Sequence, residues 1–153
     1  MTEANTKEVN TTEVQRIFLS APFIEDLGLR LESVAPGECR SSLVLERKHF
    51  QQDGYVHAGV QASVADHTAG AAGATLVGAG QYVLTAEFKI NLLRSAKGSL
   101  LTCIARVLKP GATLTVVESE VFCGTAAALR LVSKATVTLA IVSARRREGE
   151  PAG

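Results

Sequence analysis

The first apolar pattern along the chain has the spacing of a helix. A pair of threonines that can cap a helix precedes Glu13 and a set of apolar residues on one helical face. These features predict a short helix that begins at Thr11 or Thr12. Its apolar face consists of Val14, Ile17 and Phe18. The preceding segment is polar and acidic, so residues 1–10 are predicted to form a disordered tail.

Most of the rest of the chain alternates with the two-residue period of β-strands. Residues 27–46 alternate on both sides of a Pro36-Gly37 turn, which predicts two strands in a hairpin. Four later segments alternate in the same way and predict further strands. These segments cover residues 82–93, 99–111, 112–124 and 129–142.

One long segment between these strands has helical length and very small side chains. Of the 19 residues from Ala58 to Leu76, seven are alanine and three are glycine. Each helical glycine costs roughly 1 kcal/mol relative to alanine, a cost that is tolerated where a backbone must approach something closely. A helix wrapped by a curved sheet meets that condition. The pattern therefore predicts an α+β fold in which an antiparallel sheet packs against one long central helix.

Length and composition place this fold in one domain and restrict its partners. The chain has 153 residues, which suits a single domain over residues 11–143, with a flexible tail over residues 144–153. A net charge of +1 does not indicate a basic surface that would bind nucleic acid or an anionic membrane. The basic cluster Arg145–Arg147 lies in the predicted tail, where it is either a solvated terminus or a contact for a ligand phosphate.

The sequence also indicates a compartment and narrows the chemistry. It contains no signal-peptide pattern and no apolar run that could span a membrane. Three cysteines in such a chain are predicted to be free, core-forming thiols in the cytoplasm, namely Cys39, Cys103 and Cys123. No cysteine pair has metal spacing and only three histidines are present, so no metal site is expected. There is also no phosphate-binding loop and no nucleophile elbow.

Asp66 is the unusual residue of the small-residue helix. A buried carboxylate is expensive unless it is paired. Asp66 therefore either lies on an exposed face or serves as a general base or nucleophile. His57 lies nine residues earlier, where a polar loop enters the helix, and is either structural or catalytic.

The start of the same helix offers a second chemical feature. The first backbone N–H groups of a helix have no partner within it, so those near Ala58, Gly59 and Val60 can bind a carbonyl oxygen or an oxyanion. Ala58 and Asp66 are eight residues apart, about 12 Å along a helix, so one reacting carbon cannot lie near both. A two-fold dimer would bring the helix start of one chain to Asp66 of the other. The spacing thus predicts a site across a homodimer interface.

These residues together resemble a known family. The order of a short helix, two strands, the motif H-x-G-V and an aspartate nine residues after its histidine is followed by "TAEFKINLLRSA". This pattern resembles the hotdog-fold acyl-CoA thioesterases, and among them the phenylacetate-pathway subfamily. The resemblance covers residues 15–142.

The resemblance implies a hotdog fold and a set of site residues. Two sheets would join edge to edge in a homodimer, and dimers often pair into homotetramers. The backbone N–H of Ala58 would polarise the thioester carbonyl, and Asp66 of the partner subunit would activate water or attack directly. Gln51 would place the thioester or the water, and His57 would support the loop. Thr85 would bind the water or the carboxylate.

Three departures from the family pattern affect these roles. The family more often has two glycines after the histidine, whereas this chain has Ala58 and Gly59, so a methyl group crowds the approach. Gln51 replaces a more usual asparagine. Strict alternation places Thr85 on the side of Glu87, away from the helix, so its role requires a bulge or a strand end.

The resemblance favours one function over two alternatives. The leading hypothesis is an acyl-CoA thioesterase that uses water and no metal or redox cofactor. The second is a non-catalytic hotdog module that binds acyl-CoA or another acyl ligand. A hydratase of the same fold is disfavoured, because Asp53 and His57 are four residues apart rather than five. Arg94 is the candidate contact for the phosphates of coenzyme A, with Lys89 and the terminal arginines as others.

Overall fold

The structure, a computed structural model, describes residues 3–144 of the chain, and the side chains from residue 11 onward. The cluster Arg145–Arg147 and the rest of the predicted tail after Ala144 lie outside the described residues. In chain order the elements are α1 (Glu3–Phe18), α2 (Pro22–Leu27), β1 (Arg30–Ala35), β2 (Glu38–Val44), η1 (Arg47–His49), α3 (Ala58–Ala74), β3 (Gln81–Leu92), β4 (Leu100–Lys109), β5 (Leu114–Thr125) and β6 (Ala128–Ser143).

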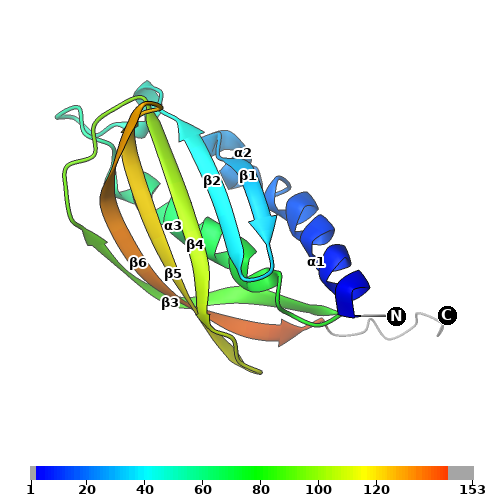
Figure 1. The fold of residues 1–153 in the computed structure, drawn as a ribbon. Helices are drawn as coiled ribbons and strands as arrows, with labels where there is room; N and C mark the ends of the chain where they lie inside the picture. The colour runs from blue at the N-terminus through cyan, green and yellow to red at the C-terminus, as the bar shows by residue number, and fades with distance from the viewer. Residues whose placement is uncertain (1–2, 145–153) are drawn as a thin grey trace.

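The six strands form one antiparallel sheet with the order β1-β2-β4-β5-β6-β3. The sheet curves around α3, and α1 lies beside β1 and also packs against α3 (Figure 1). The predicted hairpin, long helix and four later strands are thereby confirmed, as is the antiparallel sheet packed on a central helix. No helix in the described part of the chain has the length and apolar character needed to cross a membrane.

The N-terminal region differs from the prediction in two ways. α1 begins at Glu3, so residues 3–10 are helical rather than disordered. The prediction relied on the apolar face, but backbone hydrogen bonding can continue beyond the face that packs. A second helix, α2, was not predicted. It starts with Pro22, whose fixed φ suits a first helical position, and it ends at Gly28, which adopts a left-handed φ of 86°.

The small side chains of α3 let its backbone lie close to the sheet. Ala65, Ala69 and Ala72 are completely buried beneath it. At Gly73 an added methyl group would have to displace the buried Leu139 side chain, because an added Cβ would lie 2.3 Å from Leu139 Cδ1 on β6. The glycines and alanines of the sequence therefore permit close packing of the helix on the sheet, as expected.

Hydrogen bonds of buried hydroxyl groups also hold α3 against the sheet. Ser119 of β5 donates a hydrogen bond of 2.8 Å to the carbonyl of Ala65. Ser41 of β2 and Thr68 share a hydrogen bond of 2.7 Å. Each bond satisfies a buried polar group, so these groups add specificity to the packing without leaving an unpaired atom.

The cysteines belong to the same core. All three are free and buried: Cys39, Cys103 and Cys123. Burial raises the pKa of the Cys39 thiol to about 12, and that of the Cys103 thiol to about 12 as well. These thiols stay protonated at neutral pH and act as small core residues, as the sequence predicted.

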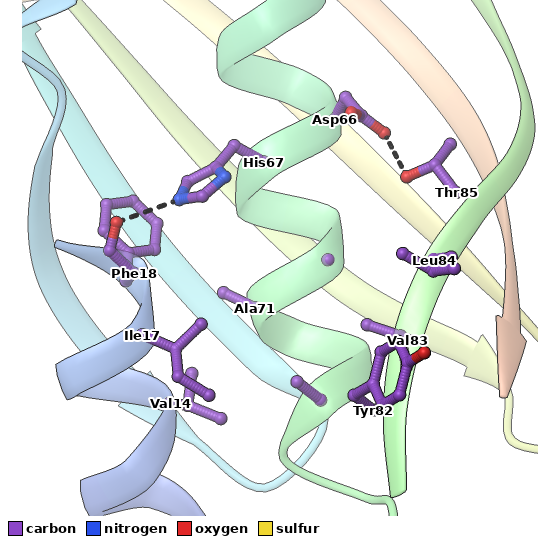
Figure 2. Close-up of a pocket in the computed structure, with 12 residues that line it drawn as sticks. Val14, Ile17, Phe18, Asp66, His67, Ala71, Tyr82, Val83, Leu84 and Thr85 are labelled. Carbon is purple, nitrogen blue, oxygen red and sulfur yellow. Dashed lines mark hydrogen bonds between the residues drawn. The ribbon is translucent and has the colours of Figure 1, made fainter. Parts of the chain in front are cut away.

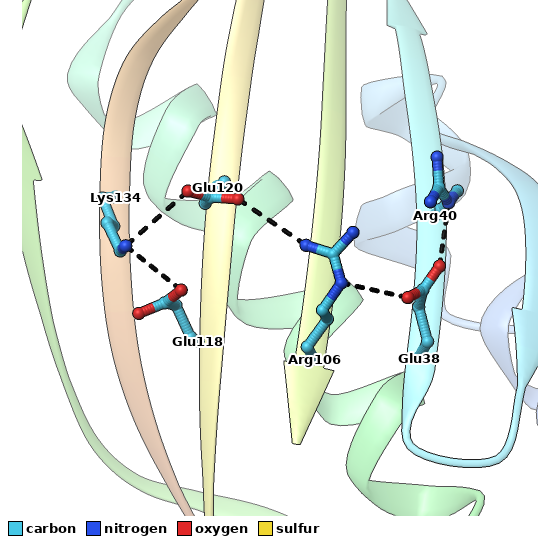
Figure 3. Close-up of polar contacts among 6 residues, drawn as sticks. All are labelled: Glu38, Arg40, Arg106, Glu118, Glu120 and Lys134. Carbon is cyan, nitrogen blue, oxygen red and sulfur yellow. Dashed lines mark hydrogen bonds and ion pairs between the residues drawn. The ribbon is translucent and has the colours of Figure 1, made fainter. Parts of the chain in front are cut away.

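The outer face of the sheet carries a row of paired charges that crosses four strands (Figure 3). Arg106 of β4 lies between Glu38 and Glu120, at 3.0 and 3.7 Å. Lys134 of β6 bonds Glu118 at 3.1 Å. Each exposed pair contributes little to stability, but together the pairs balance the three basic residues of this surface with three acidic ones. The row consists of Glu38, Arg40, Arg106, Glu118, Glu120 and Lys134.

Gly73→Ala is expected to lower the free energy of unfolding by about 1–3 kcal/mol, because the new methyl group would collide with the buried Leu139 side chain. Gly70→Ala is the matched control in the same helix, since an added Cβ at position 70 meets no atom within 4 Å. The control should be neutral or stabilising by up to about 1 kcal/mol. Urea denaturation measures both, and equal effects would contradict the close packing at Gly73.

Candidate functional site

Asp66 is held on the middle of α3 and is half-buried. Its carboxylate points toward β3, the edge strand of the sheet (Figure 2). The hydroxyl of Thr85 on β3 donates a hydrogen bond of 2.7 Å to Asp66 Oδ1 (Figure 2). This bond fixes one carboxylate oxygen and leaves the other available to a proton or a substrate atom.

A β-bulge turns Thr85 toward Asp66. The pairing of β3 with β6 shifts by one residue between Thr85 and Glu87, so Ala86 is the extra residue. The two partly buried apolar residues of β3, Val83 and Ile90, have opposite parity, which such a shift explains. The bulge that the sequence analysis required for Thr85 is therefore present.

The Asp66–Thr85 pair lies at one end of an apolar groove of about 270 Å³ between α1, α3 and β3. The open position at Gly70 faces this groove, so the glycine is not explained by packing within the chain. We refer to this space as the carboxylate groove. Its lining consists of Val14, Ile17, Phe18, Asp66, His67, Gly70, Ala71, Ala74, Tyr82, Val83, Leu84 and Thr85.

His67 connects the groove wall to α1. Its Nε2 donates a hydrogen bond of 3.1 Å to the carbonyl of Phe18, and the two rings meet edge to face with centroids 4.4 Å apart. Burial lowers the pKa of the His67 imidazole, although the bond to Phe18 and the charge of Asp66 oppose this shift. His67 is thus a neutral, positioned part of the wall.

His57 caps the start of α3. Its Nδ1 accepts a hydrogen bond of 2.9 Å from the N–H of Gly59, and its carbonyl accepts one of 3.0 Å from the N–H of Val60. Gly59 and Val60, predicted as substrate-binding, therefore have no free N–H to offer. Among the described bonds, the N–H of Ala58 has no acceptor. One amide, at the position matched to the family, remains for a ligand oxygen.

Gln51 lies on the tight turn that leads into α3. The ends of this turn pair at Phe50 and Val56, and Val56 donates a hydrogen bond of 2.9 Å to the carbonyl of Ala96. The Gln51 side-chain oxygen accepts a hydrogen bond from the N–H of Asp53. Among the described hydrogen bonds its amide nitrogen has no partner, so the side chain is oriented by its own turn.

Gln51, His57 and Ala58 line a second pocket of about 510 Å³, together with Arg94. We refer to it as the helix-start pocket. The sequence analysis missed one further member, Gln61, which is 4% exposed. Its oxygen Oε1 has no hydrogen-bond partner among the described residues. Because buried polar atoms are almost always paired, this oxygen marks a place for a donor from a ligand or a water molecule.

The predicted residues thus fall into two groups on one chain. Asp66 and Thr85 share the carboxylate groove, whereas Ala58 lies in the helix-start pocket with the loop residues. Gly59 and Val60 line neither space. The two groups are separated by about 12 Å of helix, so one reacting atom cannot contact both groups of the same chain.

The histidines serve structural roles in this arrangement. His49 is buried, with Nδ1 accepting from the N–H of Glu46 at 2.9 Å and Nε2 donating to the carbonyl of Leu27 at 2.8 Å. His57 and His67 each use one ring nitrogen in the bonds described above. Over the described residues, no group of three or more histidine, cysteine, aspartate or glutamate side chains is arranged to hold a metal.

Comparison with known proteins places this geometry in a family. The sequence profile of the Thioesterase superfamily matches residues 53–129, which include Ala58, Asp66 and Thr85. The chain belongs to the thioesterase superfamily. It is a thioester hydrolase with a hotdog fold, which confirms the predicted fold and enzyme class.

Several known proteins are similar to this chain. A thioesterase family protein from Silicibacter pomeroyi has a structure with a TM-score of 0.85 and 32% identity, covering 88% of this chain and 98% of that one. A conserved protein from Pseudomonas aeruginosa gives a TM-score of 0.74 and 30% identity, covering 83% and 98%. A 1,4-dihydroxy-2-naphthoyl-CoA hydrolase from Listeria monocytogenes is 29% identical over 63% of this chain and 79% of its own length.

The stability of this thioesterase is expected to fall below neutral pH partly through His67. The folded-state pKa is lowered, so the unfolded chain binds the proton more readily. The stability from neutral His67 is complete above the unfolded pKa of about 6.5 and is lost as the pH falls below that value. Urea denaturation should show a falling midpoint from about pH 7 to pH 5, and a smaller fall in His67→Gln. An identical slope in both proteins would contradict this role.

Proposed function

We propose that this thioesterase hydrolyses acyl-CoA to a free acid and coenzyme A, with Asp66 as the catalytic carboxylate. The observation that carries this proposal is the Asp66–Thr85 bond of 2.7 Å beside the apolar carboxylate groove. A carboxylate fixed by one hydrogen bond and open to an apolar space can accept a proton from water or attack a carbonyl carbon. The reaction uses water and needs no metal or redox cofactor.

We propose that the site is completed in a homodimer. β3 forms one edge of the sheet, is twelve residues long, and exposes large apolar side chains, such as Leu84 (54%) and Phe88 (41%). A long apolar edge strand invites pairing with another strand. A two-fold axis that brings Ala58 of one chain to Asp66 of the other passes near Ala62, midway between them, whose small side chain permits close approach. Each dimer then contains two identical sites.

The helix start of one subunit and Asp66 of the other supply complementary parts of the reaction. The N–H of Ala58 donates to the thioester carbonyl oxygen and then to the tetrahedral oxyanion. Asp66 of the partner subunit accepts a proton from water as the water oxygen bonds to the carbonyl carbon. The C–S bond then breaks, and the departing thiolate takes the proton from the carboxylic acid. In the alternative, the carboxylate itself attacks, expels the thiolate and forms an anhydride that water hydrolyses.

The carboxylate groove favours an uncharged apolar acyl group. Asp66 is its one charged residue and would repel an anionic acyl chain. A dry cavity of about 150 Å³ can hold benzene, so about 270 Å³ accommodates at least one ring or an alkyl chain of similar size. The aromatic substrate named for the Listeria relative supports an aryl group as one member of this class.

The finer classification follows from the same motifs. We place the chain in the phenylacetate-pathway subfamily and expect the dimers to pair into a homotetramer in the cytoplasm. The alternative function is a non-catalytic module that binds acyl-CoA. Asp66 and Thr85 at bonding distance support the enzyme over the module.

Asp66→Asn is expected to lower kcat for acyl-CoA hydrolysis about a hundredfold or more, because the amide can neither accept the proton nor attack. The amide oxygen can still accept the Thr85 hydrogen bond, so the fold should be kept. Thiol release from short, long and aromatic acyl-CoAs measures the rate, and Asp53→Asn in the exposed loop is the matched control. Near wild-type turnover in Asp66→Asn would remove Asp66 from the mechanism. Tight acyl-CoA binding without thiol release by the wild type would favour the binding module.

Mixing two inactive variants tests whether the site is shared. Ala58→Pro removes the free N–H with little disturbance, since proline suits a first helical position and His57 already has φ −59° and ψ 137°. In a heterodimer of Ala58→Pro and Asp66→Asn, one site carries both changes and the other carries neither. Random assortment makes half of the dimers mixed, so about a quarter of wild-type activity should return.

Each variant refolded alone is the control for this mixing experiment and should stay inactive. A site contained within one chain predicts no recovery in the mixture.

A further inference from the structure

The carboxylate groove extends from Asp66 in one direction only. On α3 every residue that lines the groove is Asp66 or a later residue, and on β3 every one is Thr85 or an earlier residue. Asp66 and Thr85 therefore lie at one end of the groove, and Val14 and Tyr82 lie at the other (Figure 2). A group that reacts at the carboxylate can extend into the groove only toward Ala74, the last residue of α3.

The surface between these two ends is apolar. Gly70 and Ala71 of α3 line it, together with Ile17 of α1 and Val83 of β3. None of these side chains has a polar atom. Ile17 is 47% exposed although its side chain is large and apolar. A concave apolar surface that starts at one polar group suits a ligand whose reactive end is polar and whose remainder is hydrocarbon.

Gly70 and Ala74 follow Asp66 at intervals of about one helical turn. Residues four positions apart lie on the same face of a helix, so these three residues form a row along the groove. Helix rise places Gly70 about 6 Å and Ala74 about 12 Å beyond Asp66. Both are half-buried. Any side chain larger than theirs would therefore project into the space that the groove occupies.

The absence of a side chain at Gly70 is not required by the fold. A glycine inside a helix is less stable than an alanine, and an added Cβ at this position would meet no atom within 4 Å. At Gly73, by contrast, the Leu139 side chain occupies the space that a Cβ would need. The open space over Gly70 is thus available to a ligand.

We propose that the acyl chain of the substrate lies along α3 from Asp66 over Gly70 to Ala74, and that the side chains at positions 70 and 74 set the longest chain that is accepted. This inference rests on the proposed acyl-CoA hydrolysis and specifies its acyl group. An alkyl chain advances slightly less than one C–C bond of about 1.5 Å per carbon, so roughly five carbons reach Gly70 and roughly nine reach Ala74.

The length dependence of two variants tests this path. Helical side chains lean toward the helix N-terminus, so each substitution fills the groove from its own position back toward Asp66. Gly70→Leu should lower kcat/KM for butanoyl-CoA and for decanoyl-CoA, each relative to acetyl-CoA in the same variant, about tenfold or more. Ala74→Leu should lower only the decanoyl-CoA ratio by such a factor. Thiol release measures all of these rates.

Ala79→Leu is the matched control, because it adds the same side chain in the exposed segment after α3 and outside the groove. Its two ratios should equal those of the wild type. Taking acetyl-CoA as the reference within each variant removes any general change in the reactivity of Asp66. Ala74→Leu lies farther from the carboxylate, so it keeps the test decisive if Gly70→Leu disturbs Asp66 itself.

The outcomes separate the acyl path from the reaction. If both groove variants keep the ratios of Ala79→Leu, the acyl chain does not follow this row, even though hydrolysis proceeds. Loss of the butanoyl-CoA ratio in Ala74→Leu but not in Gly70→Leu would contradict the direction of the chain. If the wild type cleaves no acyl-CoA, the proposed function fails, and calorimetric titration with decanoyl-CoA then decides the path: equal affinity of Gly70→Leu, Ala74→Leu and wild type would overturn it.

Discussion

The close contact between α3 and the sheet is the constraint on which the other features depend. Ala65, Ala69 and Ala72 bring the helix backbone so near the strands that Ser119 can reach the carbonyl of Ala65. A larger side chain on this face would push the helix outward and break that bond. Asp66 directly follows the bonded carbonyl of Ala65, so the carboxylate lies on a turn of the helix that is hydrogen-bonded to the sheet. Catalytic groups work best on such rigid supports.

The helix that is held in this way also sets the distance between the two parts of the proposed site. Because α3 is a continuous helix, the distance between its start and Asp66 is fixed, and Ala58 and Asp66 of one chain cannot approach each other. Two copies of the chain can combine them. A substrate bound across the proposed interface would place its thioester carbonyl on one subunit and its acyl group against the other. Substrate recognition is then divided between the subunits, and a lone chain would hold only part of the molecule.

Sequence reasoning predicted the features that depend on local patterns. The strands and α3 follow from periodicity and composition, and the separation of Ala58 and Asp66 along α3 follows from helix rise. Features that depend on tertiary contacts were missed or wrong. The N–H of Gly59 was expected to be free, but the His57 ring folds back to bind it. Gln61 gave no signal, because a glutamine in a helix is ordinary until its buried surroundings are known.

Nor could the sequence locate the space beside Asp66. The apolar face of α1 was recognised from the spacing of Val14, Ile17 and Phe18, yet nothing local indicates that this face would form a wall of the carboxylate groove. The role of Gly70 is hidden for the same reason. Gly73 and Gly70 look alike in the sequence, but one makes room for Leu139 and the other opens onto the groove.

The bulge in β3 gives Ala86 an unusual kind of importance. Its side chain makes no described bond, and many residues could replace it without consequence for the site. Its presence in the backbone, however, decides which side of the strand Thr85 occupies relative to Phe88. Removing this one residue would restore strict alternation and turn the Thr85 hydroxyl away from Asp66, while the apolar edge beyond it stayed in register. We therefore expect position 86 to tolerate substitution but not deletion. The number of residues in β3, rather than the chemistry of residue 86, brings the Thr85 hydroxyl to the Asp66 carboxylate.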